Sequence, residues 1–205
     1  MVTVAKLASR LNWHRNPHPL HAGKWPCFFL FTDQHRLPDP MDVLQRLPRG
    51  AAVVLRHPDQ NQLRDLARRI VPAAHRLGLL VLLAGDVRLA LQYGCDGVHL
   101  SQHRARRGPQ RILFPGPDFL ITAAAHDAMS LRRAARAGAH VVMLSPVFAT
   151  QSHVGAKPMG ALRFARLAAR SVRPVIALGG VTPRGAKRLS LGPACGIGAI
   201  GAWRA

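Results

Sequence analysis

Polar side chains that can hold an anion or move a proton follow several short apolar runs of this sequence. Arg56 ends the second run, His126 follows the fifth, and Thr150, Ser152 and His153 lie in the loop after the sixth. Hydroxyl and guanidinium groups bind phosphate and carboxylate oxygens well. An imidazole can also accept and donate protons near neutral pH. These residue types predict a site for a small anionic ligand.

Glycines follow the last two apolar runs. Gly179 ends the seventh run, Gly180 comes directly after it, and Gly201 follows the eighth. Backbone N–H groups at such glycines can bind a phosphate. Taken alone, a Gly-Gly pair is better explained by a tight turn between a strand and a helix. The choice therefore depends on where the fold places these residues.

The elements that must position these residues are eight short apolar runs rich in Val, Ile and Leu, as expected for strands buried on both faces. They lie at 27–32, 51–56, 79–84, 96–100, 119–124, 140–145, 174–179 and 196–200. Amphipathic segments alternate with them, most clearly at 60–77, 127–137 and 160–170, with Asp127 as the expected N-cap of the second.

Eight strands alternating with helices predict a parallel sheet closed into a (β/α)₈ TIM barrel. No GxGxxG motif follows the first run, which argues against a dinucleotide-binding sheet. We expect a basic helix or linker over 1–26 and the barrel over 27–205, without its last helix unless the N-terminal segment replaces it. Barrel ligands bind at the carboxyl ends of the strands, with phosphate often held after strands seven and eight. This placement favours phosphate binding, over a tight turn alone, as the role of Gly179, Gly180 and Gly201.

The composition narrows the class of protein. The 205 residues contain no apolar run of membrane-spanning length, no signal-peptide pattern is evident, and three isolated cysteines suggest small core residues, so we expect a reduced, cytoplasmic protein. The net charge of +20 comes from 29 basic residues against nine aspartates. Because the arginines are scattered over helices without a nucleic-acid-binding motif or an aromatic platform, we expect solvated helix faces and no nucleic-acid partner. Whether the chain forms homo-oligomers is left open.

Several motifs in order resemble the thiamine phosphate synthase/TenI family over about residues 27–203. They are "FFLFTD", "GCDGVHLSQ", "AGAHVVMLSPVFATQSH", "PVIALGGVTP" and "GIGAIGA". The resemblance implies a barrel that binds a thiazole phosphate. Synthase members join it to a pyrimidine diphosphate with Mg²⁺ and release pyrophosphate. TenI-type members instead isomerise a thiazole carboxylate phosphate by proton transfer, and the residue that carries the proton falls on His126. We expect His99, inside "DGVHL", to be structural.

Departures from the family pattern bear on the choice between these reactions. Of a Gln-x-Arg-x-Lys pattern in synthases, only Arg56 remains, and a lysine of the sixth loop is replaced by His153. The two aspartates that the resemblance implies as Mg²⁺ ligands fall on Gly85 and Arg104, leaving Asp86 one position away. Mg²⁺ needs hard oxygen ligands, so Mg²⁺ use is doubtful unless Asp86 or Asp33 supplies one. Arg104 could instead pair with a diphosphate.

The resulting expectation is a thiamine-biosynthesis enzyme acting on a phosphorylated small molecule. The substitutions favour a TenI-like thiazole tautomerase over a divergent thiamine phosphate synthase. A barrel that binds a phosphorylated metabolite for regulation, without catalysis, is the alternative of another class.

Overall fold

The structure, a computed structural model, describes residues 25–107, 116, 118–151, 155, 157–189 and 194–200. The expected N-terminal helix, Ser152, His153, Gly201 and any segment after the eighth strand lie outside these described residues. In the described part of the chain, every helix is too short or too polar to span a bilayer.

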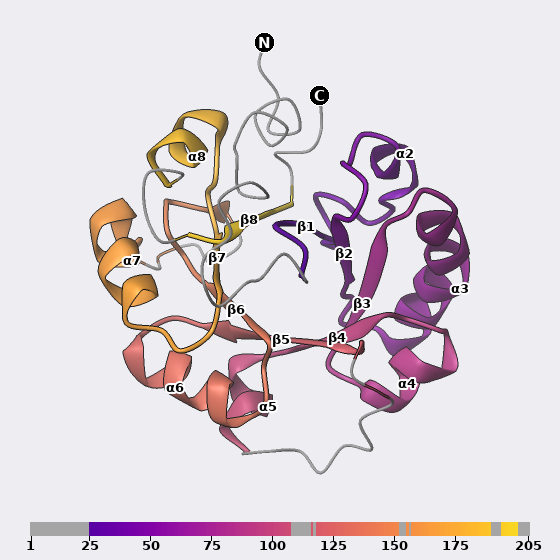
Figure 1. Ribbon diagram of the computed structural model, residues 1–205. Coiled ribbons are helices and arrows are strands. Elements are labelled where there is room, and N and C mark those ends of the chain that lie inside the picture. The colour runs from indigo at the N-terminus through magenta and orange to yellow at the C-terminus, as the bar shows by residue number, and fades with distance from the viewer. Residues whose placement is uncertain are drawn as a thin grey trace.

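Eight parallel strands close into a barrel in chain order, so the predicted (β/α)₈ fold is confirmed (Figure 1). The strands are β1 (Phe28–Phe31), β2 (Ala52–Leu55), β3 (Leu80–Ala84), β4 (Gly97–Leu100), β5 (Leu120–Ala125), β6 (Val141–Leu144), β7 (Val175–Leu178) and β8 (Gly196–Ala199). Each predicted apolar run corresponds to one strand, and β5 extends one residue beyond its predicted run, to Ala125. The ring closes where β1 pairs with β8, through Phe28 and Ile197.

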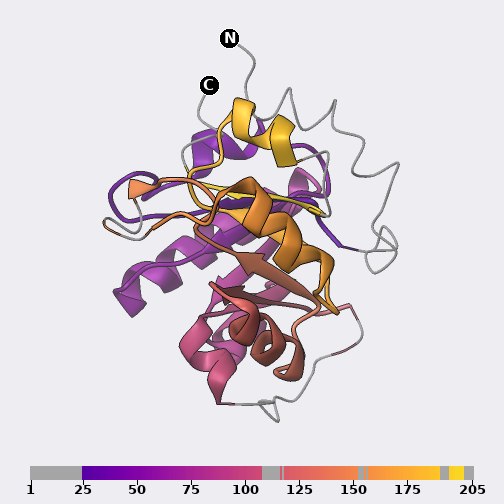
Figure 2. The same ribbon diagram turned by 90° about the vertical axis from the view of Figure 1, so that its left-hand side faces the viewer.

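Helices lie outside the ring of strands in both views (Figures 1 and 2). They are α2 (Met41–Leu44), α3 (Gln60–Arg76), α4 (Val87–Gln92), α5 (Gln102–Arg106), α6 (Ala128–Arg136), α7 (Gly160–Ala169) and α8 (Pro183–Leu189). The predicted N-cap of α6 is confirmed, because the Asp127 side chain accepts a hydrogen bond from the Ser130 N–H at 2.7 Å.

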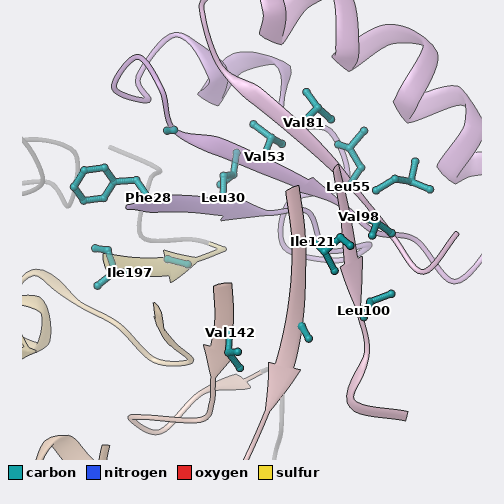
Figure 3. Packing of buried hydrophobic residues seen from close by; sticks show 14 of the residues in the cluster. Phe28, Leu30, Val53, Leu55, Val81, Val98, Leu100, Ile121, Val142 and Ile197 are labelled. Carbon is teal, nitrogen blue, oxygen red and sulfur yellow. The ribbon is translucent and has the colours of Figure 1, made fainter. Parts of the chain in front are cut away.

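Alternate residues of each strand divide the core into two parts, as the period of two requires. Leu30, Val53, Val81, Ile121 and Val142 face the helices and belong to the larger cluster (Figure 3). The other strand faces contribute a second, interior cluster, whose buried members are each no more than 4% exposed. Its members are Phe29, Phe31, Ala52, Val54, Leu82, Leu120, Val141, Met143, Ile176 and Cys195.

The two ends of the barrel differ. At the amino ends of the strands, the Trp25 ring stacks on His140 at a centroid distance of 4.9 Å and packs against the interior cluster. At the carboxyl ends, Ala84, Ala124 and Leu178 are only half-buried although they lie in strands. The open end is therefore the one where barrels bind ligands.

The cysteines are buried and unbridged, as expected. Burial raises the pKa of the Cys27 and Cys95 thiols to about 12. A thiol with so high a pKa is almost never a thiolate at neutral pH, so these two residues serve packing.

Candidate functional site

Arg56 is held rigidly at the carboxyl end of β2. Its Nε donates to the Thr32 carbonyl at 2.6 Å, and one terminal nitrogen donates to Asp33 Oδ2 at 3.0 Å. The Thr32 hydroxyl accepts from the Arg56 N–H at 2.8 Å and donates to the Arg56 carbonyl at 2.9 Å. The guanidinium also lies over the Phe31 ring, 5.9 Å from its centroid. These contacts leave the side chain 37% exposed, so it can still meet a ligand.

Asp33 bridges two arginines beside this position. Its Oδ2 accepts from Arg56 and from Arg36, the latter at 2.8 Å. Hydrogen bonds from Arg36, and from the backbone N–H groups of Arg36 and His35, hold the pKa of Asp33 well below its usual range. Burial lowers the pKa of Arg56 from its usual value, and Asp33 opposes that shift. This carboxylate is therefore committed to ion pairs.

The positions where the resemblance implies Mg²⁺ ligands are occupied by Gly85 and by Arg104, whose guanidinium lies close to where a side chain of residue 85 would begin. A Cβ on Gly85 would lie 3.5 Å from Nε of Arg104 and 3.7 Å from its central carbon. Gly85 has a φ of +94°, and its N–H donates to the His99 carbonyl at 3.0 Å. A fixed positive charge thus lies at the end of β3.

The nearby carboxylates do not form a metal site. Asp86 caps α4 by accepting from the Leu89 N–H at 3.1 Å, and Asp33 is paired with arginines. Among the residues that the structure describes, no three His, Cys, Asp or Glu side chains are grouped closely enough to hold a metal ion. Because Mg²⁺ prefers carboxylate oxygens, the residues present do not fit it.

His126 lies just beyond β5, with its ring fixed by the end of β6. Its Nδ1 is 2.7 Å from the Ser145 carbonyl oxygen and 3.3 Å from the Ser145 hydroxyl. A carbonyl oxygen can only accept, so Nδ1 carries the proton in the neutral ring and Nε2 is the basic nitrogen. The His126 N–H donates to the Ser130 hydroxyl at 2.9 Å, which ties the residue to the start of α6.

The β6 and β7 loops are joined through their backbones beside Gly179 and Gly180. The N–H groups of Val147 and Phe148 donate to the carbonyls of Leu178 and Gly179, each at 3.0 Å. Both glycines have positive φ, +88° and +63°. A Cβ on Gly180 would collide with the Ala149 carbonyl oxygen.

These contacts give a different explanation for why glycine is needed at positions 179 and 180. The sequence suggested close approach to a ligand, whereas the structure shows close approach to the neighbouring loop. Among the described residues, no hydrogen bond uses the N–H of Gly179 or Gly180 as donor. Their use for a phosphate therefore stays a prediction, and the geometry is compatible with it.

The sequence also matches a family of known proteins. The family model of thiamine monophosphate synthase (TMP-TENI) matches residues 28–204. The chain belongs to the thiamine monophosphate synthase family.

Relatives support this membership over most of the chain. The thiamine-phosphate synthase of Chlorobium luteolum is 32% identical over 182 residues, covering 86% of this chain and 84% of that protein. That of Laribacter hongkongensis is 33% identical over 157 residues, covering 75% and 74%. The structure of a thiamine phosphate pyrophosphorylase from Pyrococcus furiosus aligns with a TM-score of 0.67 at 18% identity, covering 87% and 86%, and supports the fold.

Within this family barrel, the structure places the described candidate residues at one end. Arg56, Arg104 and His126 follow β2, β4 and β5, while Thr150 and the glycine pair follow β6 and β7. Asp86 lies at the same end but serves as a helix cap. Ser152, His153 and Gly201 are outside the described residues, so their roles stay predictions.

The surroundings of His99 could not be predicted from the sequence. Its Nδ1 lies 2.9 Å from the Thr122 hydroxyl, and its ring meets Phe31 edge-to-face at 5.3 Å. Burial, assisted by the positive charge of Arg56, lowers the pKa of His99 to about 3. The imidazole is therefore neutral at physiological pH. The alternation of "DGVHL" was the available signal, but it left the facing of the side chain open.

Proposed function

We propose that this protein is an enzyme of thiamine biosynthesis that binds a thiazole phosphate and uses His126 to transfer a proton. The observation that carries this proposal is the 2.7 Å contact between His126 Nδ1 and the Ser145 carbonyl. It makes Nε2 the basic nitrogen of the neutral ring, and this atom is the proposed acid–base group. A neutral imidazole of fixed tautomer can remove one proton and return it elsewhere on the same substrate.

The phosphate would be held by the joined β6 and β7 loops. The N–H groups of Gly179 and Gly180 and the Thr150 hydroxyl are the donors proposed for it, with Ser152, His153 and Gly201 as further predicted contacts. Backbone donors suit a phosphate because they carry positive partial charge without needing a counterion. This anchor would place the thiazole ring towards the centre of the barrel.

Isomerisation of a thiazole carboxylate phosphate is the reaction we favour. It moves a proton within one substrate and needs no second substrate or leaving group. The contact between Arg104 and Gly85 supports this choice, since the carboxylates expected for a Mg²⁺-assisted diphosphate reaction are missing there. The mechanism therefore has the loops bind phosphate, Ser145 orient His126, and His126 exchange the proton through Nε2.

A second candidate is the thiamine phosphate synthase reaction, which the names of the relatives favour. In that case Arg56 and Arg104 would hold the diphosphate of the pyrimidine substrate, since guanidinium groups pair well with phosphate oxygens. This chemistry would differ from the family pattern in relying on an arginine, Arg104, at the position of one metal ligand.

Two assays separate these reactions. The purified protein is incubated with thiazole carboxylate phosphate and its isomerisation is followed. In parallel it is given thiazole phosphate, pyrimidine diphosphate and Mg²⁺, and thiamine phosphate is measured. Isomerisation that is lost in His126→Ala, while thiazole phosphate binding is kept, is the expected result. Robust thiamine phosphate formation would instead establish the synthase reaction. Binding that raises the melting temperature without turnover of any kind would establish a regulatory barrel.

A further inference from the structure

His99 points into the barrel. Its strand neighbours Val98 and Leu100 belong to the outer cluster packed by the helices, so the residue between them faces inward. The two side chains that His99 contacts agree with this. Phe31 belongs to the interior cluster, and Thr122 lies on β5 between two residues of the outer cluster.

The imidazole of His99 reaches the open end of the barrel. His99 is 9% exposed, whereas Val98 and Thr122 are fully buried. Its strand partner on β3 is Ala84, and Ala124 lies two residues beyond Thr122 on β5. Both alanines are half-buried at positions that face the interior. Their side chains are small, and beside them His99 keeps the 9% of its surface that is exposed.

One nitrogen of this ring is already used and the other is not. Nδ1 is bonded to the Thr122 hydroxyl, which is also within 3.4 Å of the Val98 carbonyl. Within the part of the chain that the structure describes, no hydrogen-bond partner meets Nε2. A buried polar atom without a partner is destabilising, so such atoms are usually paired with protein, water or ligand.

The charges around the ring decide what kind of group can pair with it. The neutral imidazole offers a single hydrogen bond and no charge, while Arg56 and Arg104 supply the positive charges of the open end. A phosphate would gain more from those guanidinium groups than from a neutral ring. The partner of Nε2 is therefore an uncharged polar atom.

We propose that Nε2 of His99 forms the floor of the ligand site and hydrogen-bonds an uncharged polar atom of the ligand's heteroaromatic part. His99 would then be a specificity-determining residue, selecting the ring while the loops and arginines bind the anionic groups. This inference rests on the proposed function, because it takes the ligand to be a phosphorylated heteroaromatic compound. A site that hydrogen-bonds a ligand atom discriminates strongly against analogues that lack the atom.

The test compares two substitutions that mimic different ring nitrogens. The amide of His99→Asn lies near the position of Nδ1 and can keep the bond to Thr122. The longer amide of His99→Gln reaches towards the position of Nε2. Affinities of the full chain for thiazole phosphate and thiamine phosphate are measured by calorimetry, with inorganic pyrophosphate as a probe that has no ring.

We expect His99→Asn to melt near the wild-type temperature and to bind at least one ring-containing probe about 10-fold more weakly, the loss expected for one neutral hydrogen bond. Pyrophosphate affinity should stay unchanged, and His99→Gln should recover part of the loss. Equal affinity of wild type and His99→Asn for both ring-containing probes would overturn the inference while leaving the proposed function intact. Failure of the wild type to bind either one would overturn both.

A measurement on the wild type covers the case in which the asparagine variant is unstable. The ¹⁵N signals of the His99 ring are recorded with and without thiazole phosphate and thiamine phosphate. A change confined to Nε2 on addition of either one is expected. A ring whose signals do not move with a bound ligand would contradict the contact.

Discussion

The guanidinium of Arg104 lies against Gly85, with Nε 3.5 Å from the point where a Cβ of residue 85 would stand. The two residues are brought together by the ends of neighbouring strands β3 and β4. The positive charge of Arg104 is therefore located where the family resemblance implies a bound Mg²⁺. We therefore predict that anion binding at this position needs no metal.

Arg104→Ala tests that consequence. We expect the variant to bind inorganic pyrophosphate about 10-fold more weakly or worse, because a charge-assisted hydrogen bond contributes about 1.5–3 kcal/mol. Wild-type affinity should not change on adding EDTA. The control is Arg106→Ala, which removes an exposed arginine of the same helix. Loss of wild-type binding in EDTA, or equal losses in both variants, would show that Arg104 has no special role.

Asp33→Asn probes the arginine pair beside the site. Hydrogen bonds from Arg36 lower the pKa of Asp33 in the folded protein, so the ionised form stabilises the fold at pH values above the unfolded pKa, near 4. We expect the variant to lose about 1–2 kcal/mol of unfolding free energy at pH 7. The difference should shrink as pH falls below about 4, because the unfolded carboxyl then binds a proton while the folded one, whose pKa is lower, stays ionised.

Urea denaturation of both proteins between pH 7 and pH 3 measures this difference. Asp65→Asn is the matched control, because the pair of Asp65 with Arg68 is largely exposed on α3 and should contribute less than about 1 kcal/mol. If the difference in unfolding free energy between wild type and Asp33→Asn grew towards low pH, the prediction would be contradicted.

Gly180→Ala should be strongly destabilising. The new Cβ meets the Ala149 carbonyl oxygen and the Phe148 backbone, in addition to a φ of +63°. We expect a loss of about 3 kcal/mol or more. At Gly50, which has a φ of +76° and no atom within 4 Å of a Cβ, alanine should cost about 1–2 kcal/mol from the backbone alone. Equal melting temperatures for the two variants would argue against tight contact between the β6 and β7 loops.

Ser145→Ala separates the backbone from the side chain at His126. The carbonyl at 2.7 Å makes the shorter contact with Nδ1, and the hydroxyl is at 3.3 Å. We expect ¹⁵N spectroscopy to show the same His126 tautomer in the variant, and any turnover to fall by less than about 10-fold, the effect of one neutral hydrogen bond. A tautomer switch in the variant would mean that the hydroxyl, not the carbonyl, orients the ring.

The fold could be predicted from the sequence because each buried strand gives a separate apolar run and each amphipathic segment a helix. The cap at Asp127 was equally readable, since capping is local. The contact of Arg104 with Gly85 was not, because it joins residues brought together only by neighbouring strands. Whether the His99 side chain points into the barrel or towards the helices depends on the register of its strand. A shift of the register by one residue would have turned it outward. The role of Gly180 depended on a loop about thirty residues away in the chain.

The joined β6 and β7 loops also bear on how this barrel can change over evolution. Up to Ala149, the sixth loop is matched to its neighbour by two backbone hydrogen bonds and by the missing side chain at Gly180. Insertions or bulky residues there would force two loops to rearrange at once. Thr150 is the next residue after this matched stretch. The stretch from Val147 to Ala149 would therefore tolerate few changes, because each change there must suit both loops.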